Sequence, residues 1–183
     1  MTTTSLPKII GLLARSRSGK DTVCDYIISN YPNIHIQKRR LAQPVKDAVC
    51  ALYGFTSEQL EGSYKDVVDK RIGISPRNAM VKITHDVMES MGHDFFSRKL
   101  FSEFDENKNS ANTIIIPDVR YSHDILEIKK RGGIVIKIER HGLNVPRYKW
   151  EDIIDNMKGD CHILNDSSIE ELYYQVDQII RNL

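Results

Sequence analysis

A chain of 183 residues with 40% hydrophobic and 28% charged side chains has the composition of a globular protein, and we expect one domain over residues 1–183. A formal net charge of +1 argues against nucleic acid or a membrane surface as a partner. Neither a signal peptide nor a long apolar segment is visible, and three widely spaced cysteines favour a reducing, cytoplasmic location.

Strands and helices alternate in the hydrophobic pattern of the chain. The predicted strands cover residues 8–13, 34–38, 113–119, 134–139 and 161–164. β-Branched runs at 114–116 and 134–136 are typical of strands that are buried on both faces of a parallel sheet. Because helical patterns separate the strands, the sequence predicts an α/β fold with a central parallel sheet flanked by helices.

The predicted helices are recognised by apolar stripes and by signals at their ends. The stripes comprise Val45, Ala48, Val49 and Leu52 in one helix and Met80, Ile83, Val87 and Met91 in another. Ser75 is expected to cap the start of the second helix and Gly92 to end it. Further along, Ser122 is expected to cap a helix, and Ser168 with Glu171 predicts a capping box.

The segment from Ala14 to Thr22, with the sequence ARSRSGKDT, joins the first predicted strand to a helical pattern. Its length and its Gly-Lys pair match a P-loop, in which backbone N–H groups at a helix N-terminus surround a phosphate. Lys20 is placed to reach the β- and γ-phosphates of a nucleotide. Ala14 replaces the usual first glycine, and Asp21 replaces the usual Ser or Thr. The alternative is a Gly-Lys pair that occurs by chance in a strand-to-helix turn.

An acidic residue ends the third predicted strand, in the segment IIIPDVR at residues 114–120. A carboxylate at this position, Asp118, matches the residue that holds Mg²⁺ beside a P-loop. The alternative is that Asp118 caps the turn that follows it. Arg120 either binds a phosphate or forms an ion pair with Asp118.

Lys46 and Arg77 fall in the first turns of predicted helices, where the helix dipole disfavours a cation. A phosphate partner accounts for both positions, and so does simple exposure to solvent. Phe95 is placed either to stack on a nucleotide base or to pack in the core.

Polar segments follow the last two predicted strands, at the sheet edge where ligands of α/β proteins bind. Arg140, with Arg147, Lys149 and Trp150, is arranged as in the lid of a phosphoryl-transfer enzyme, or else lies in a solvated loop. Asn165, after the fifth strand, lies either near an adenine or in the cap of the last helix.

In their order along the chain, these segments resemble deoxynucleoside monophosphate kinases of phages and large DNA viruses. The resemblance covers residues 8–180 and includes RSGKDT at 17–22, LAQPVKD at 41–47, ISPR at 74–77, GHDF at 92–95, DVR at 118–120 and LNDS at 164–167. It implies a P-loop kinase fold with a five-stranded parallel core. It also implies ATP as the phosphoryl donor, Mg²⁺ as the metal and a deoxynucleoside monophosphate (dNMP) as the acceptor.

The resemblance further implies roles for individual residues. The ATP-binding set comprises Arg15, Ser16, Arg17, Ser18, Gly19, Lys20, Asp21, Thr22, Arg140 and Asn165. The dNMP-binding set comprises Lys46, Arg77, Phe95, Arg120 and Trp150, and the metal-binding set comprises Asp21, Thr22 and Asp118. The catalytic set comprises Lys20, Arg77, Arg120 and Asp118. We also expect an acceptor-binding helical region over residues 40–105 and a short lid over 140–160.

Two other functions stay open at this point. Related Gly-Lys-Asp-Thr loops occur in dephospho-coenzyme A kinase, so a P-loop kinase for another small acceptor is one alternative. The second is a catalytically inactive nucleotide-binding module, because the methyl group of Ala14 would narrow the phosphate cradle. The sequence also leaves open whether the chain forms a homodimer.

Overall fold

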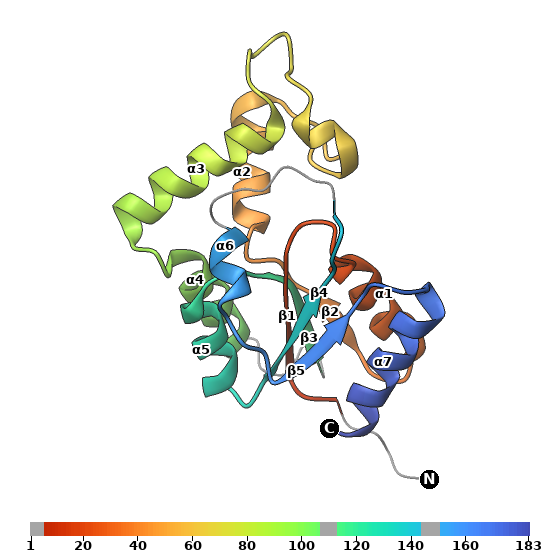
Figure 1. Ribbon diagram of the computed structural model, residues 1–183. Coiled ribbons are helices and arrows are strands. Elements are labelled where there is room, and N and C mark those ends of the chain that lie inside the picture. The colour runs from red at the N-terminus through yellow and green to blue at the C-terminus, as the bar shows by residue number, and fades with distance from the viewer. Residues whose placement is uncertain (1–5, 107–112, 144–150) are drawn as a thin grey trace. The chain divides into compact units, whose positions relative to one another are not determined.

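The computed structural model describes residues 6–106, 113–143 and 151–183 (Figure 1). Its contacts divide the chain into two compact units. The first comprises Met1–Arg40 and Phe101–Leu183 and contains the sheet, and the second comprises Leu41–Leu100 and is largely helical. Among the described residues, no helix combines the length and the apolar character that crossing a membrane requires.

A five-stranded parallel sheet forms the centre of the first unit, in the order β2-β3-β1-β4-β5. Its strands are β1 (Ile9–Ala14), β2 (Ile36–Lys38), β3 (Thr113–Val119), β4 (Ile134–Glu139) and β5 (Cys161–Leu164). The predicted α/β fold is therefore confirmed, with small shifts at the ends of β1 and β2. Because the strands are parallel, their carboxyl ends share one edge of the sheet. The predicted phosphate-binding segments of this unit come directly after the strands and therefore begin at that edge.

Helices cover both faces of this sheet. The helices of the first unit are α1 (Lys20–Asn30), α5 (Ser122–Lys130), α6 (Glu151–Asp155) and α7 (Ile169–Arg181). Helices α1 and α7 lie on one face and α5 lies on the other (Figure 1). Leu12 of β1 packs in a core with Ile27 of α1 and Val176 of α7. The next residue back, Gly11, faces Ile128 of α5, as the alternation of side chains along a strand requires.

The second unit is built from short helices around a small core. Its elements are α2 (Gln43–Tyr53), the 3₁₀ helix η1 (Gly62–Asp66), α3 (Pro76–Met91) and the start of α4 (Phe95–Glu106). The buried residues of the core are Val49, Phe55, Leu60 and Ala79. The unit falls within residues 40–105, the range that the sequence predicts for acceptor binding.

Capping residues in the sequence predict the starts of some helices correctly and of one helix incorrectly. Ser75 caps α3 by accepting a hydrogen bond from the Asn78 N–H, as predicted. Ser168 caps α7 by accepting from the Glu171 N–H, which is one half of the predicted capping box. The prediction that Ser122 caps α5 is wrong, because the helix already begins at that residue. Instead, a carboxylate oxygen of Asp124 accepts hydrogen bonds from the two N–H groups just before the helix. A charged acceptor binds such groups more strongly than a hydroxyl does.

The two predicted apolar stripes are correct in their centres and wrong at their ends. Val45 and Val49 are buried on α2, but Leu52 is 71% exposed. The α3 stripe is half-buried at Met80, Ile83 and Val87, whereas Met91 is 55% exposed. Both exposed residues lie in the last turn of their helix, where less of the unit remains to cover them.

Candidate active site

The loop between β1 and α1 has the backbone of a phosphate-binding loop. Arg17 has a φ of +63° and Gly19 a φ of +96°, so two left-handed residues shape the turn before the helix. Ser16 is half-buried and Ser18 is fully buried within this loop. Gly19 is the N-cap of α1, and no described side chain caps this helix. The first N–H groups of α1 therefore point to a site that an anion can occupy.

Three cations surround the carboxylate of Asp21 in the first turn of α1. Its oxygens lie 3.4 Å from Lys20 Nζ, 3.0 Å from Arg40 Nη2 and 3.5 Å from Lys38 Nζ. Lys38 Nζ also lies 2.9 Å from a carboxylate oxygen of Asp25. Cations that gather beside a helix N-terminus favour a multiply charged anion such as a nucleotide phosphate.

These cations keep Asp21 ionised. Burial acts to raise the pKa of the Asp21 carboxyl, but Lys20, Arg40 and Lys38 outweigh it and lower the pKa to about 2. Lys38 and Arg40 come from the carboxyl end of β2, and neither was among the predicted site residues. The signal that would find them is the basic run at residues 38–40, directly after a strand of a parallel sheet.

Asp118 lies on β3, beside the strand that leads into the loop. The register of β1 against β3 shifts between Gly11 and Leu13, so β3 carries one extra residue there. Pro117, which has no N–H to donate, and Asp118 occupy this bulge. Asp118 is only 8% exposed. The next turn carries Arg120, whose backbone N–H donates to Asp124 at 3.0 Å.

The predicted metal ligands suit a hard cation. Asp21 and Thr22 lie in the first turn of α1, and Asp118 lies near the carboxyl end of the neighbouring β3. Together they offer two carboxylates and a hydroxyl, the oxygen donors that Mg²⁺ prefers. The chemistry of this donor set therefore fits a Mg²⁺ ion that is bound together with phosphate oxygens.

Residues at both sides of the loop fix its position. Asn165, directly after β5, is buried and donates from Nδ2 to the carbonyl oxygen of Ser18 at 2.9 Å. Arg15 forms an ion pair with Asp155 of α6. Ala14 is 6% exposed, and its side chain packs in the core that α1 and α7 cover. The methyl group of Ala14 therefore belongs to the core of the first unit.

The two predicted acceptor cations are both paired within the second unit. Lys46 forms an ion pair with Glu61, which directly precedes η1. Arg77 donates from Nε and Nη2 to the two carboxylate oxygens of Asp66, at 2.6 and 3.2 Å. The Lys46 and Arg77 side chains are only 12% and 18% exposed. Simple exposure to solvent, which was one of the alternatives from the sequence, therefore does not explain the positions of these two cations.

The structure gives fewer contacts for the remaining predicted site residues. Phe95 is half-buried at the start of α4 and meets Phe96 edge to face, with ring centroids 5.3 Å apart. Arg140 follows β4 and is exposed. Trp150, with Arg147 and Lys149, lies outside the described residues.

Comparison with known proteins identifies the family. A family model described as deoxynucleotide monophosphate kinase matches residues 8–73 and 57–176, which is most of the chain. The chain belongs to the deoxynucleotide monophosphate kinase family. The predicted resemblance to dNMP kinases is therefore confirmed, and so is the prediction of a phosphotransferase.

Viral proteins are among the relatives of this family member. It is 28% identical over 189 residues to a protein provisionally named deoxynucleotide monophosphate kinase in Acanthamoeba polyphaga mimivirus, with 95% of this chain and 96% of that protein covered. It is 24% identical over 243 residues to the deoxynucleotide monophosphate kinase of Enterobacteria phage T4, with 96% and 100% covered. Among solved structures, a shikimate kinase from Bacteroides thetaiotaomicron aligns with 96% of this chain and 98% of its own, at 10% identity and a TM-score of 0.43.

The phage member of the family is longer than this one. Its alignment runs over 243 positions, more than the 183 residues of this chain, so the phage protein carries insertions. The family model matches in two segments that overlap over residues 57–73, around η1 in the second unit. The overlap includes the segment that carries Glu61 and Asp66, so both matched parts of the dNMP kinase family model cover it.

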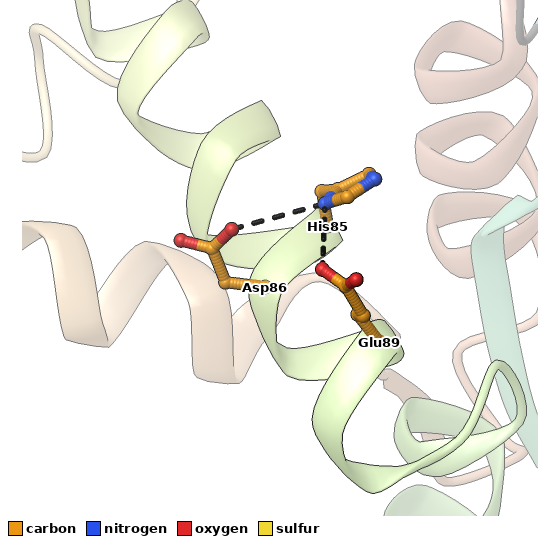
Figure 2. A group of neighbouring side chains, drawn as sticks. All are labelled: His85, Asp86 and Glu89. Carbon is orange, nitrogen blue, oxygen red and sulfur yellow. Dashed lines mark ion pairs between the residues drawn. The ribbon is translucent and has the colours of Figure 1, made fainter.

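A separate group of ionisable side chains lies on the surface of α3. Figure 2 shows His85, Asp86 and Glu89, with His85 Nδ1 3.8 Å from an oxygen of each carboxylate. The three side chains are 73%, 62% and 76% exposed. Ion pairs this long and this exposed contribute little to stability and are screened by salt. We interpret the group as surface charge on α3, not as part of the kinase site.

Proposed function

We propose that this chain transfers the γ-phosphoryl group of ATP to the 5′-phosphate of a dNMP, which yields ADP and a deoxynucleoside diphosphate. The observation that carries the proposal is the N-terminus of α1, which no described side chain caps and which Lys20, Lys38 and Arg40 flank. Such a helix end binds phosphate through its N–H groups. Membership of the dNMP kinase family supports the acceptor class.

The donor nucleotide is assigned to the first unit. The proposed contacts are the loop residues 15–19 with Lys20, Asp21 and Thr22, and farther along the chain Arg140. Asn165 contributes to the donor site through its hydrogen bond to Ser18 of the loop. Lys20 neutralises charge on the β- and γ-phosphates, and the loop N–H groups hold those phosphates in place. The acceptor phosphate is itself the nucleophile, so the reaction needs positioning and charge stabilisation more than a covalent catalyst. A site made of cations and backbone N–H groups meets this need.

Mg²⁺ is the proposed metal, held by Asp21, Thr22 and Asp118. When bound, the ion neutralises charge on the phosphate oxygens of ATP. The low pKa of Asp21 keeps its carboxylate charged at neutral pH, the form in which it accepts a cation. The bulge in β3 brings a second carboxylate, Asp118, to the carboxyl end of the strand beside β1.

The acceptor is assigned mainly to the second unit. Lys46 and Arg77 are the proposed contacts for the dNMP phosphate and Phe95 for its base, with Arg120 and Trp150 completing the set. The ion pairs with Glu61 and Asp66 hold both cations in defined positions before the substrate arrives. Cations that are ordered in advance lose less side-chain entropy on binding. Charge-assisted contacts to a phosphate then supply the affinity.

The packing of Ala14 favours an active kinase over an inactive nucleotide-binding module. The inactive alternative rests on a methyl group that would narrow the phosphate cradle. In the structure this residue is the last of β1 and packs in the core with Val23 and Cys24 of α1. A side chain directed into the core leaves the space over the loop N–H groups unchanged.

The test is ADP release from Mg·ATP with a panel of deoxynucleoside and nucleoside monophosphates, and with dephospho-coenzyme A. We expect turnover with one or more dNMPs. Lys20→Ala is expected to lower kcat by about 10³-fold or more, because it removes a charge that the transition state requires. Lys8→Ala changes an exposed lysine at the opposite end of β1 and is the matched control, with unchanged kcat.

Three results would contradict the proposal. Turnover with dephospho-coenzyme A but with no dNMP would assign a different acceptor. ATP binding without ADP release for any acceptor would identify an inactive module. Full activity of a correctly folded Lys20→Ala variant would remove the loop from the mechanism.

A further inference from the structure

A buried hydrogen bond joins the end of β5 to the phosphate-binding loop. Asn165 and Ser18 are 147 positions apart in the sequence, yet Asn165 Nδ2 donates to the Ser18 carbonyl oxygen at 2.9 Å. Asn165 is 8% exposed, and its own backbone N–H donates to the carbonyl of Glu139, the last residue of β4, at 2.8 Å. The backbone that carries the side-chain amide is therefore anchored to the sheet.

This bond sets the direction of a peptide group in the loop. The peptide between Ser18 and Gly19 is trans, so its C=O and its N–H point in opposite directions. Because Asn165 holds the Ser18 oxygen, the Gly19 N–H points away from Asn165. This N–H lies directly before α1, among the groups that receive a phosphate at a helix N-terminus. Turning the peptide over would present a carbonyl oxygen to the phosphate in place of the N–H.

The loop and Asn165 also fit each other sterically. A Cβ atom on Gly19 would lie 2.4 Å from Asn165 Nδ2, closer than two such atoms can approach. Gly19 also has a φ of +96°, which a residue with a side chain rarely adopts. The absence of a side chain at Gly19 therefore serves both its backbone conformation and the close approach of Asn165.

We propose that Asn165 is a positioning residue that locks the Ser18–Gly19 peptide in the orientation that binds phosphate. The proposal deepens the proposed function and rests on it only in taking ATP as the source of that phosphate. From the sequence, Asn165 is expected near the adenine or in a helix cap. Its buried amide donates instead to the loop, so Asn165 acts on the nucleotide through Ser18 and Gly19.

The direct test is the crystal structure of the unliganded Asn165→Asp variant. A carboxylate only accepts hydrogen bonds, so it repels the Ser18 carbonyl and attracts the Gly19 N–H. We expect the Ser18–Gly19 peptide to be turned over in this variant. A variant structure in which the Ser18 carbonyl still faces residue 165 would overturn the proposal. This measurement requires neither nucleotide nor catalysis.

ATP affinity, measured by calorimetry, is the second readout. We expect Asn165→Ala to weaken ATP binding by about 10-fold, since one hydrogen bond that orders the loop is lost. Asn165→Asp is expected to weaken it by about 100-fold, because it favours the reversed peptide. The KM for the dNMP is expected to stay within about two-fold, as loss of loop order alone does not alter acceptor contacts. Folded variants that bind ATP as the wild type does would overturn the proposal.

Asn182→Ala is the matched control. Asn182 also donates its side-chain amide to a backbone carbonyl, that of Gln178, but at the far end of α7 and in an exposed position. We expect it to leave ATP affinity and the KM for the dNMP unchanged. Thermal unfolding of each variant verifies that the chain is folded before its affinity is compared.

A double-mutant cycle keeps the proposal testable without Asn165→Asp. Gly19→Ala adds a methyl group that meets Asn165, and it also carries the cost of a positive φ. That backbone cost is the same in both backgrounds and cancels in the cycle. We therefore expect Gly19→Ala to weaken ATP binding less in the Asn165→Ala background than alone. Strictly additive effects on ATP affinity would overturn the proposed contact.

Failure of this proposal is distinguishable from failure of the proposed function. A wild-type chain that binds ATP and releases no ADP with any dNMP would contradict the kinase activity. The peptide orientation in Asn165→Asp and the order of ATP affinities would still support or overturn the role of Asn165.

Discussion

Arg77 and Asp66 form a two-point ion pair within the second unit. The guanidinium donates from Nε and Nη2 to the two carboxylate oxygens, at 2.6 and 3.2 Å. Asp66 is the last residue of η1, and Arg77 lies in the first turn of α3. Two parallel hydrogen bonds fix the plane of the guanidinium, which a single ammonium contact does not do. The pair therefore sets the direction of the charge proposed to bind the dNMP phosphate.

This ion pair predicts that a lysine at position 77 cannot perform the function of Arg77. We expect Arg77→Lys to lower kcat/KM for the dNMP by about 10- to 100-fold, since the charge is kept and the two-point geometry is lost. The KM for ATP is expected to stay within about two-fold. Steady-state kinetics with each substrate varied in turn separates the two effects.

Arg71→Lys is the control for this substitution. Arg71 forms an equivalent two-point pair with Asp69, at 3.0 and 2.7 Å, in the same unit, but its side chain is 64% exposed. We expect its kinetics to match those of the wild type. Equal losses in the Arg71 and Arg77 variants would indicate a general effect on the unit and would contradict a specific phosphate contact.

The second prediction concerns the charge of Asp21 and the pH dependence of stability. The pKa of Asp21 is lowered from 3.8 to about 2 in the folded chain, because Lys20, Arg40 and Lys38 outweigh its burial. A lowered folded-state pKa stabilises the folded chain at pH values above the unfolded-state pKa. That contribution is lost as the pH falls through the folded-state value. Asp21 therefore stabilises the chain fully above about pH 4 and progressively less toward pH 2.

Urea unfolding of the Asp21→Asn variant between pH 3 and pH 7 measures this contribution. We expect the variant to lose about 1 kcal/mol of unfolding free energy at pH 7, a value reduced by solvent screening of a half-exposed carboxylate. The difference from the wild type is expected to shrink at pH 3. Asp25→Asn, which removes a partner of Lys38 only, is expected to cost less. A difference that is independent of pH would contradict an ionic origin.

The sequence predicts those parts of the molecule that depend on local patterns. The β-branched runs at 114–116 and 134–136 predict buried parallel strands, and the Gly-Lys pair predicts the loop before α1. Once the strands are parallel, topology brings the segments that follow them to one edge. This explains why the position of Asp118 near the carboxyl end of its strand was predictable without any knowledge of tertiary contacts.

Contacts between distant residues were not predictable in the same way. Arg40 meets Asp21 because β2 and α1 belong to one unit, and the basic run at residues 38–40 indicates a site at that sheet edge without indicating this partner. The bond from Asn165 to Ser18 likewise joins segments at opposite ends of the chain. The exposure of Leu52 depends on how far along α2 the rest of the second unit covers the helix. The hydrophobic periodicity of the sequence predicts which face is buried and does not predict this length.

The third prediction concerns the close packing of β1 against α5. A Cβ atom on Gly11 would lie 2.6 Å from Ile128 Cδ1 and 3.0 Å from Val119 Cγ2. Both isoleucine and valine are fully buried, so neither side chain has free space to move into. We expect Gly11→Ala to destabilise the chain by about 1–3 kcal/mol through overpacking. The measurement is the free energy of unfolding in urea.

Removing the atom that causes the clash tests its origin. Ile128→Val deletes Cδ1, so Gly11→Ala combined with Ile128→Val is expected to cost less than the sum of the single changes. Ile163→Val shortens a buried side chain in the core on the opposite face of the sheet and is the control. Its effect is expected to add to that of Gly11→Ala. Additivity in both pairs would contradict the contact with Ile128.

The fourth prediction concerns the contact between the segments that follow β4 and β5. Asp166 accepts hydrogen bonds from the backbone N–H of His141 at 2.7 Å and from its Nδ1 at 2.5 Å. These two contacts lower the pKa of the Asp166 carboxyl. Because the folded-state pKa of Asp166 is lowered, as it is for Asp21, the contact stabilises the folded chain above the ordinary carboxyl pKa. Its contribution weakens as the pH falls below that value. We expect the His141 amide to exchange its hydrogen at least about 10-fold faster in Asp166→Ala than in the wild type.

Hydrogen exchange of individual amides, measured by NMR, tests this contact with an internal control. Asp160 accepts a hydrogen bond from the Val135 N–H at 2.8 Å, so Asp160→Ala is expected to expose Val135 and to leave His141 protected. In the wild type, protection of His141 is expected to be lower at pH 3 than at pH 6, after correction for intrinsic exchange rates. If Asp166→Ala leaves the protection of His141 unchanged, another interaction orders the segment after β4. Because Arg140 is a proposed ATP contact, a loss of protection accompanied by a raised KM for ATP would tie this contact to the donor site.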